Sequence, residues 1–270
     1  MEELVMRYGI IGGTGVYQPG DLPGATRERV HTPYGDVEVT LGTYEGKEVA
    51  FLPRHGSSHS VPPHRVNYRA NIWALKQLGV ETVLATAAVG SLNRLFRPGD
   101  LVVIDDVIDW TKGRPSTFFE HGPVVHIDFS DPYCARVRKG LVETARHLGL
   151  RVHHGGVYVC AEGPRFESKA EIALFARLGG DVVGMTSMPE AALAKEAEMC
   201  YATVCMVTNW AAGMAAKPLS HEEVLEAMRE NVADIRRLFF AYIARDTGVR
   251  DCACGSAVGG QVPLRGESEA

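Results

Sequence analysis

Two short segments of this 270-residue chain carry residue types that bind anions. Gly12-Gly13-Thr14-Gly15 follows an apolar run, and Arg54-His55-Gly56 ends another. Glycines let successive backbone N–H groups converge on an anion, and the Thr14 hydroxyl adds a further donor. The guanidinium group of Arg54 offers a planar fork that matches phosphate oxygens. Each segment alone is also typical of a tight turn, so both are candidates for a phosphate site.

The glycine-rich segment does not fit a dinucleotide-binding fold. That fingerprint needs a third glycine, and Gln18 occupies its position. Asp36 does lie about twenty residues farther on, where such folds bind the ribose with an acid. Asp36, however, follows Thr32-Pro33-Tyr34-Gly35, which is typical of a turn rather than of a strand end. A dinucleotide cofactor is therefore not expected.

A third segment, Thr86–Ser91, ends an apolar run, Val80–Ala88, in small residues. A run that is nearly all apolar is typical of a buried central strand. Small side chains at its end permit a ligand to approach the backbone, although they are also compatible with simple packing of a helix on the sheet. The segment is a further candidate for the binding site.

The elements that would hold these segments alternate between apolar runs and capped helical stretches, which predicts an α/β fold with a mixed or largely parallel sheet. A helix over Asn67–Leu78 stops at Gly79, and capping signals at Asp131-Pro132, Ser168 and Ser220 begin three more. The expected strands, the second and third of which form a hairpin, are Tyr8–Ile11, Val37–Leu41, Glu48–Leu52, Val80–Ala88, Leu101–Ile104, Val157–Cys160 and Val182–Met185.

Bulk properties narrow the class of protein. No Pro/Ser-rich linker or charge block divides the chain, so we expect one domain over residues 1–247 and a flexible C-terminal tail over 248–270. The net charge of −5 argues against a nucleic-acid partner. No apolar run approaches the roughly 20 residues of a membrane helix, and the first ten residues lack the apolar centre of a signal peptide. We therefore expect a cytoplasmic protein without a membrane partner.

The six cysteines contain no Cys-x-x-Cys pair, so a structural zinc site is not expected and no metal is predicted. Cys252-Ala253-Cys254 has an unusual spacing near the C-terminus. One interpretation is a pair of reduced thiols on a mobile tail. The other is a disulfide, with each other or with another cysteine, which we expect only if the source is thermophilic.

A series of motifs, in order over roughly residues 8–240, resembles the family of trimeric purine nucleoside phosphorylases and 5′-methylthioadenosine phosphorylases. The motifs are IGGTG at Ile11, RHG at Arg54, VNYRANIWALKQLG at Val66, TAAVGSL at Thr86, EGPRFES at Glu162, GMTSMPE at Gly184 and TNWAAG at Thr208. Their common order makes the resemblance far more specific than any one motif. It implies a single α/β domain, with a distorted mixed β-sheet flanked by helices, that assembles as a homotrimer.

The resemblance also implies how phosphate and sugar are bound. Phe166 is expected to pack against the base or sugar, and Met185 to line the ribose. A neighbouring subunit is expected to close the sugar end through the segment around His126 and Phe129. The methylthioadenosine branch often has Thr where this chain has Ala87, so one hydroxyl contact is not assured here. The implied phosphate-binding residues are Thr14, Arg54, His55, Ala87 and Ala88 through their backbone, and Thr186.

Two positions decide the base that the resemblance implies. Asn209 and Ala211, on either side of Trp210 in the base pocket, stand where adenine-specific members carry Asp. An Asn amide can accept a hydrogen bond from a protonated purine N7 while donating to O6, whereas a carboxylate would face O6 with an acceptor. Glu167 stands where 6-oxopurine enzymes have Glu, and it can accept from the N1–H that neutral adenine lacks. The structural alternatives are a turn residue at Asn209 and a helix-capping acid at Glu167.

His221 corresponds to the His that bonds the ribose 5′-hydroxyl in 6-oxopurine enzymes, and its alternative is an exposed histidine. The chain is therefore predicted to be a 6-oxopurine nucleoside phosphorylase that cleaves inosine or guanosine. Asn209 is the expected catalytic residue, inorganic phosphate the co-substrate, and no cofactor is needed. One alternative is a phosphorylase for S-methyl-5′-thioinosine or 5′-methylthioadenosine. An alternative of another class is a non-enzymatic nucleoside-binding domain.

Overall fold

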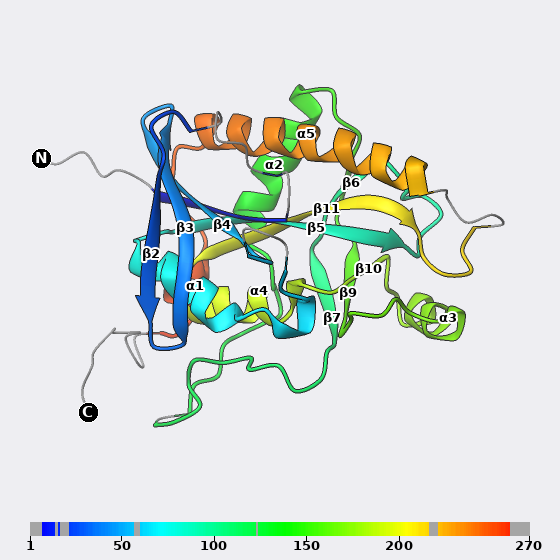
Figure 1. Ribbon diagram of the computed structural model, residues 1–270, viewed down its shortest axis with the longest axis horizontal. Coiled ribbons are helices and arrows are strands. Elements are labelled where there is room, and N and C mark those ends of the chain that lie inside the picture. Colours follow the sequence, from blue (N-terminus) through cyan, green and yellow to red (C-terminus); the bar gives the residue numbers. More distant parts are fainter. Residues whose placement is uncertain are drawn as a thin grey trace, which may run out of the picture.

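A computed structural model describes residues 7–13, 16, 22–56, 60–122, 124–215 and 221–259. In these residues eleven strands form one mixed β-sheet with helices on both faces (Figure 1). α1 (Tyr68–Gln77) and α4 (Ser187–Glu196) cover one face, and α2 (Ala135–His147) and α5 (His221–Arg245) cover the other. This is the α/β fold with a mixed sheet flanked by helices that the sequence predicts. None of the described helices is both long and apolar enough to cross a bilayer.

The strands run in the spatial order β2-β3-β4-β1-β5-β10-β9-β7, while β11, β6 and β8 branch off at β5. Of these strands, β2, β7, β8 and β11 were not expected from the sequence. The strand bounds are β1 Arg7–Gly12, β2 Thr26–Thr32, β3 Gly35–Tyr44, β4 Lys47–Pro53, β5 Thr82–Ser91, β6 Leu101–Val103, β7 Asp106–Trp110, β8 Val152–His154, β9 Val157–Ala161, β10 Val182–Gly184 and β11 Cys200–Trp210.

The sheet divides at β5, and this division positions the site described below. One edge of β5 pairs with β11 in parallel along its whole length. The other edge pairs in parallel with β1 over Thr82–Ala85 and then, antiparallel, with β10 over Gly90–Ser91. Between these two pairings, residues 86–89 have no strand partner on that edge within the described chain. The Thr86 carbonyl there accepts a hydrogen bond from Arg54, and the rest of this stretch can face a ligand.

Each face of the sheet buries its own hydrophobic core. On one face, Ile72 of α1 and Leu193 of α4 are fully buried together with side chains of β5. On the other face, Leu141 of α2 and Phe239 of α5 are buried against β6 and β11. Burying a side chain of this size contributes about 1.5–3 kcal/mol. The strands that reach the site are therefore clamped between two packed layers.

Capping side chains explain where two helices begin. Asn67 accepts a hydrogen bond from the Ala70 N–H at the start of α1. α3 (Lys169–Arg177) opens with the expected capping box, in which Ser168 accepts from the Glu171 N–H and the Glu171 carboxylate accepts from the Ser168 N–H. The sequence therefore predicts both starts correctly, because the capping bonds are local.

One helix begins later than predicted, and another was not predicted. The helix expected to open at Asp131-Pro132 begins at Ala135 instead, after Cys134, which makes no capping bond. α4 was not expected at all. Eight of its ten residues are buried, so its sequence shows no polar face to mark a helix.

The C-terminal segment differs from the expected loose tail. Over residues 248–259 the chain packs back on the domain, with a short 3-10 turn, η2 (Ala253–Ser256), and with Cys254 and Val258 buried. Arg250 helps to hold it there, because its guanidinium donates to the Glu198 carbonyl at 2.7 Å. Residues 260–270 lie outside the described part of the chain.

The crossing of α2 and α5 makes a testable stability prediction. A Cβ at Gly140 would lie 2.7 Å from Cε2 of Tyr242, whose buried ring is held by a hydrogen bond from its hydroxyl to Asp246. We expect Gly140→Val to destabilise the protein by about 1–3 kcal/mol through overpacking. Thermal unfolding measures the loss. The matched control is Glu143→Val at an exposed position of α2, where the change should stay within about 0.5 kcal/mol. Equal effects of the two variants would contradict the packing argument.

Candidate active site

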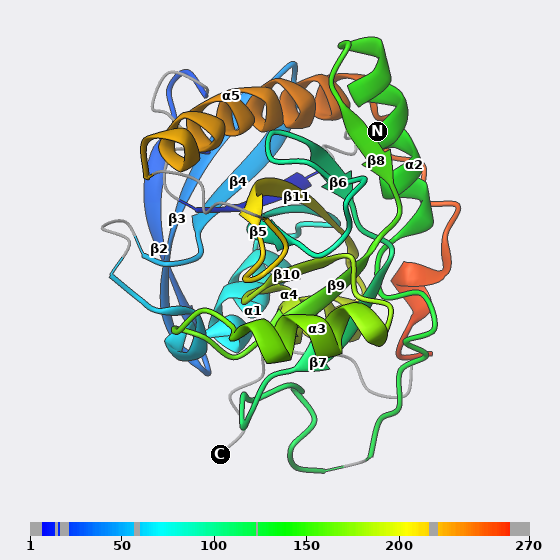
Figure 2. The same cartoon turned by 90° about the vertical axis from the view of Figure 1, so that its right-hand side faces the viewer.

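A cavity of about 980 Å³ opens where the sheet divides at β5. Figure 2 looks onto this end of the sheet, where the ends of β5 and β11 lie between α5 and α3. The cavity brings together ten residues that the sequence singled out, from five separate parts of the chain. They are Arg54, His55, Ala87, Ala88, Phe166, Glu167, Met185, Thr186, Asn209 and Ala211.

Arg54 forms a charged wall at one end of the cavity. Its side chain is 4% exposed. Two of its nitrogens donate to the two carboxylate oxygens of Glu190, at 2.7 and 2.6 Å, and a third donates to the Thr86 carbonyl at 2.8 Å. Such a bidentate pair fixes the plane of the guanidinium group. Arg54 is therefore held in one orientation before any ligand arrives.

Glu190 keeps this buried arginine charged. Burial alone would lower the pKa of Arg54, but the charge and hydrogen bonds of Glu190 outweigh it and raise that pKa. Glu190 is itself fully buried and also accepts a hydrogen bond from the Tyr201 hydroxyl at 2.8 Å. The sequence analysis missed its role. The available signal was an acid inside GMTSMPE, in a stretch that is otherwise apolar or small.

The neighbours of Arg54 add further polar groups to this end of the cavity. His55 Nδ1 lies 2.9 Å from the Val61 carbonyl, which can only accept, so Nδ1 carries a proton and the imidazole ring is held in place. Thr186 stands before α4 and makes no side-chain capping bond, while its N–H donates to the Tyr158 hydroxyl. A positive charge, an imidazole and a hydroxyl thus border one end of the cavity.

Arg114 shapes the loop that carries Met185, and the sequence analysis missed it. Its side chain is 3% exposed. The guanidinium donates to the carbonyls of Met185, Met188 and Glu162 at 2.9, 2.7 and 2.7 Å. These bonds tie the β9 end to the turn before α4. Arg114 follows Lys112-Gly113 in a stretch without a strong pattern, so no sequence signal marks it.

Asn209 reaches the cavity because β11 contains a β-bulge. Val207 pairs with Val89 and Asn209 with Gly90, so Thr208 is an extra residue between them. A bulge of this kind re-aims the following side chain. The Asn209 amide nitrogen consequently lies close to Gly90, 3.4 Å from where a Cβ at that position would stand.

The orientation of the Asn209 amide is set by two neighbours. The Thr208 hydroxyl donates a hydrogen bond to Oδ1 at 2.8 Å, and Nδ2 donates one to the Trp210 carbonyl at 2.9 Å. These two hydrogen bonds identify which terminal atom of the amide is the oxygen and which is the nitrogen. One further acceptor site on Oδ1 and one further hydrogen on Nδ2 are left for a ligand. Thr208 is a positioning residue that the sequence analysis did not identify.

Glu167 and Phe166 border the cavity from the loop before α3. Glu167 is half-buried, and its burial raises the pKa of the carboxyl group above the usual range. Phe166 is 84% exposed although it lines the cavity, so it stands at the mouth. Ala211 is buried beside Asn209 and adds no polar atom from its side chain. This end of the cavity therefore combines an amide, a carboxyl group and an aromatic ring.

Other predicted site residues are not in this cavity or cannot be assigned to it. Trp210 does not line it, and contributes its backbone carbonyl to Asn209. Thr14 lies outside the described residues, although the neighbouring Gly13 lines the cavity. α5 begins at His221 as expected, but the side chain of His221 is outside the described part. Phe129 borders a separate hollow of about 470 Å³.

Comparison with known proteins identifies the group to which this arrangement belongs. Residues 7–244 match the phosphorylase superfamily. The chain is 57% identical to a probable 6-oxopurine nucleoside phosphorylase of Moorella thermoacetica, over 94% of this chain and 98% of that one. It is 53% identical to the 6-oxopurine nucleoside phosphorylase of Pyrococcus furiosus, over 94% and 98%.

A solved structure agrees with these sequence matches. The methylthioadenosine phosphorylase from an antarctic soil metagenomic library is 35% identical, with a TM-score of 0.89 over 95% of this chain and 92% of that one. The fold is thus shared with this relative over most of both chains. The chain belongs to the phosphorylase superfamily, in the family of purine nucleoside and methylthioadenosine phosphorylases that its motifs resemble.

Proposed function

We propose that this protein is a cytoplasmic 6-oxopurine nucleoside phosphorylase of purine salvage, which converts inosine or guanosine and phosphate into free base and ribose 1-phosphate. One observation carries the proposal. A single cavity has a fixed guanidinium charge, Arg54, at one end and an oriented amide, Asn209, at the other. The first suits an anionic co-substrate, and the second suits the edge of a purine. The relatives named as 6-oxopurine nucleoside phosphorylases support this assignment.

Phosphate binds at the Arg54 end. The guanidinium retains unused N–H groups beyond those that bind Glu190 and Thr86, and its charge is fixed by Glu190. His55, the Thr186 hydroxyl and the backbone of Ala87 and Ala88 supply the remaining contacts. Thr14, on the glycine-rich segment, adds one hydroxyl. The edge of β5 at residues 86–89, which lacks a strand partner within the described chain, supports this use of its backbone.

The purine binds at the Asn209 end. Nδ2 donates to O6, Glu167 accepts from N1–H, and Oδ1 accepts from N7–H once the departing base has taken a proton at N7. Only the carboxylate form of Glu167 can accept the hydrogen bond from N1–H. Because the pKa of Glu167 is raised, a fall in pH protonates this carboxylate at a higher pH than it would an ordinary glutamate. Phe166 covers the base or sugar from the mouth of the cavity, and Met185 lines the ribose.

The reaction follows from these contacts. A phosphate oxygen attacks C1′, the C1′–N9 bond breaks, and its electron pair passes to the purine. The sugar develops oxocarbenium character, negative charge accumulates on the base toward N7 and O6, and N7 takes a proton from water as the base departs. The hydrogen bond from Nδ2 to O6 strengthens as that charge grows, and Oδ1 accepts from N7 as N7 is protonated, so Asn209 stabilises the transition state more than the bound nucleoside. Arg54 holds the nucleophile in line, and proximity supplies much of the remaining acceleration.

The 5′ substituent defines a second candidate function. One solved relative is named as a methylthioadenosine phosphorylase, so a 5′-methylthio substrate is the natural competitor. His221 favours a hydroxyl, because an imidazole can donate to or accept from it, whereas a thioether is only a weak acceptor. Loss of that bond corresponds to about 5- to 150-fold discrimination. A panel of inosine, guanosine, adenosine and their 5′-methylthio forms, assayed with phosphate, separates the two functions.

We also propose that the enzyme is a homotrimer whose sugar pocket is completed by a neighbouring subunit. Phe166 and Val124 are 84% and 76% exposed, and exposed apolar side chains of this size mark surfaces that another chain covers. Residues 111–134 form a long irregular connection, of a kind that is usually functional. Phe129, together with His126, lies on it, and within one chain Phe129 borders a different hollow from the cavity.

The phosphate site predicts that base release requires phosphate. Arg54→Ala should lower kcat/KM for phosphate by at least about 100-fold, because it removes a charge-assisted clamp. Glu190→Gln should give a smaller loss, since the neutral amide no longer holds the guanidinium by charge. Arg29→Ala, in an exposed ion pair with Glu38, is the control and should leave the rate unchanged. Inosine hydrolysis at the same rate in phosphate-free buffer would refute a phosphorylase.

The base site predicts a preference for inosine or guanosine over adenosine of about 100-fold or more in kcat/KM, because the wrong base leaves buried polar groups unpaired. Asn209→Asp should weaken 6-oxopurine turnover strongly. Thr208→Val, which keeps the shape of the side chain but removes the hydroxyl next to Oδ1, should lower kcat more than it raises KM. Wild-type protein that cleaves adenosine as fast as inosine would overturn the assignment of Asn209 and Glu167.

The shared pocket predicts complementation between two defective chains. Light scattering should give the mass of a trimer at assay concentration. Co-expressed Arg54→Ala and Phe129→Ala chains should be more active than either variant alone, because a hybrid contains some sites with both native residues. An active monomer would contradict the proposal, and so would hybrids with no more activity than the parent variants.

A further inference from the structure

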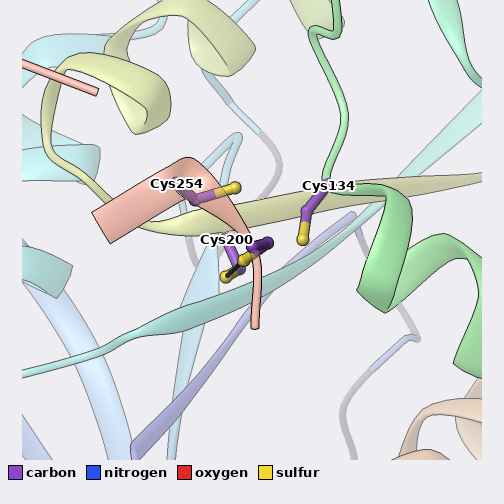
Figure 3. A group of neighbouring side chains, drawn as sticks. Cys134, Cys200 and Cys254 are labelled. Atoms are coloured by element: carbon purple, nitrogen blue, oxygen red, sulfur yellow. Dashed lines mark hydrogen bonds between the residues drawn. The ribbon is translucent and has the colours of Figure 1, made fainter. Parts of the chain in front are cut away.

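Four cysteines that are far apart in the sequence meet in the structure. Cys134 precedes α2, Cys200 begins β11, and Cys252 and Cys254 belong to the C-terminal segment around η2. All four sulfur atoms lie within 4.8 Å of one another. Figure 3 shows three of these side chains arriving from three separate elements. The sequence analysis set a zinc site aside because it found no Cys-x-x-Cys pair, but the fold assembles the group without one.

We propose that Cys134, Cys200, Cys252 and Cys254 form a structural metal site that binds Zn²⁺ through four thiolates. Zinc prefers four sulfur ligands in a tetrahedron, with Zn–S bonds of about 2.3 Å, and this sets the sulfurs about 3.8 Å apart. The distances between the four sulfur atoms, all within 4.8 Å, are compatible with such a tetrahedron. Cys200 and Cys252, whose sulfurs are 3.4 Å apart, are much farther from each other than the roughly 2.05 Å of a disulfide.

The burial of the group agrees with a closed structural site. Cys134, Cys200 and Cys254 are buried, and Cys252 is half-buried. Structural zinc sites use all four coordination positions for protein ligands, whereas catalytic sites keep one open for water. Soft thiolate ligands also select zinc over magnesium, calcium and manganese. Four cysteines with no other ligand type therefore define both the metal class and a structural role.

Two arginines next to the group fit thiolates better than neutral sulfur. The side chains of Arg136 and Arg250 place positive charge near the Cys200 sulfur. Their outer nitrogens bind Asp246 at 2.8 Å and Glu81 at 3.8 Å, but their Nε atoms are buried without a partner among the described residues. Hydrogen bonds to the coordinating sulfurs are a usual part of metal–thiolate sites. A thiol or disulfide sulfur is only a weak acceptor for such N–H groups.

The metal would fasten the C-terminal segment to the domain rather than take part in catalysis. Cys200 and Asn209 stand nine residues apart on β11, which separates them by about 30 Å along the strand. Cys252 and Cys254 are the segment's contribution, and Cys134 and Cys200 belong to the domain. The site thus explains why residues 248–259 pack closely after α5 has ended.

The metal content of the full chain tests the proposal directly. Protein purified anaerobically, without reductant or chelator, from cells supplied with zinc should carry about one Zn²⁺ per chain by elemental analysis. After unfolding with chelator and no reductant, all six cysteines should react as thiols. The double variant Cys252→Ser with Cys254→Ser should bind less than about a tenth of that zinc, because two ligands of four are gone. Cys205→Ala, which removes a buried cysteine outside the group, is the control and should keep it.

A second measurement applies even where the double variant folds poorly. Removal of the metal from wild-type protein should lower the melting temperature by about 5 °C or more, and Zn²⁺ but not Mg²⁺ should restore it. Cobalt in place of zinc should give the visible absorption of tetrahedral thiolate coordination. Metal-free protein with six reactive thiols would overturn the proposal. Metal-free protein with only two reactive thiols would also overturn it, and would show that the four sulfurs form two disulfides.

Discussion

The division of the sheet at β5 is the constraint on which the site depends. One strand has to pair with β11 along one edge and with β1 and then β10 along the other. The pairing with β1 ends at Ala85 and the pairing with β10 begins at Gly90, so a stretch of β5 is left between them. Buried backbone groups without partners are costly in an ordinary core. Here Arg54 donates to the Thr86 carbonyl, and the stretch Thr86–Val89 lines the cavity, where a ligand can satisfy further groups.

The charge of Arg54 is the second requirement of that cavity. A buried guanidinium without a counter-ion would be strongly destabilising, so the fold supplies Glu190 from α4 on the opposite side. The Arg54–Glu190 pair has no net charge, but the guanidinium group of Arg54 stays positive where it borders the cavity. Tyr201 in β11 also donates to Glu190, which links the Arg54 end of the cavity to the strand that carries Asn209. The two ends of the cavity are therefore built on one connected framework.

Sequence reasoning succeeds where the signal is local and fails where it depends on the fold. The capping box at Ser168, the hairpin between β3 and β4, and the apolar run of β5 depend on neighbours in the sequence, and all are found as predicted. Asp131-Pro132 has the residues of a helix start but lacks the helix until Ala135, since the chain there follows tertiary contacts. α4 has no amphipathic pattern because it is buried nearly all round.

The same distinction holds for the site. Motif order predicts residues that would touch a ligand, and the fold gathers ten of them around one cavity. It does not identify the residues that hold them. Glu190, Thr208 and Arg114 act through side chains that meet only in three dimensions. The four-cysteine group is the strongest case, because its members come from three elements and no spacing rule relates Cys134 to Cys200.

In the proposed function, the choice of base depends on the few atoms around the Asn209 amide. Asn and Asp have nearly the same shape, so Asn209→Asp would fit the same space beside Gly90. They differ in that Asn presents a donor and an acceptor, whereas Asp presents two acceptors. Thr208 donates to Oδ1 and the Trp210 carbonyl accepts from Nδ2, so the surroundings already distinguish the two ends of the amide. A carboxylate would set an oxygen against the Trp210 carbonyl. The local backbone therefore favours the amide even without a ligand, and in the proposed function the bulge of β11 would contribute to base selection together with Asn209 itself.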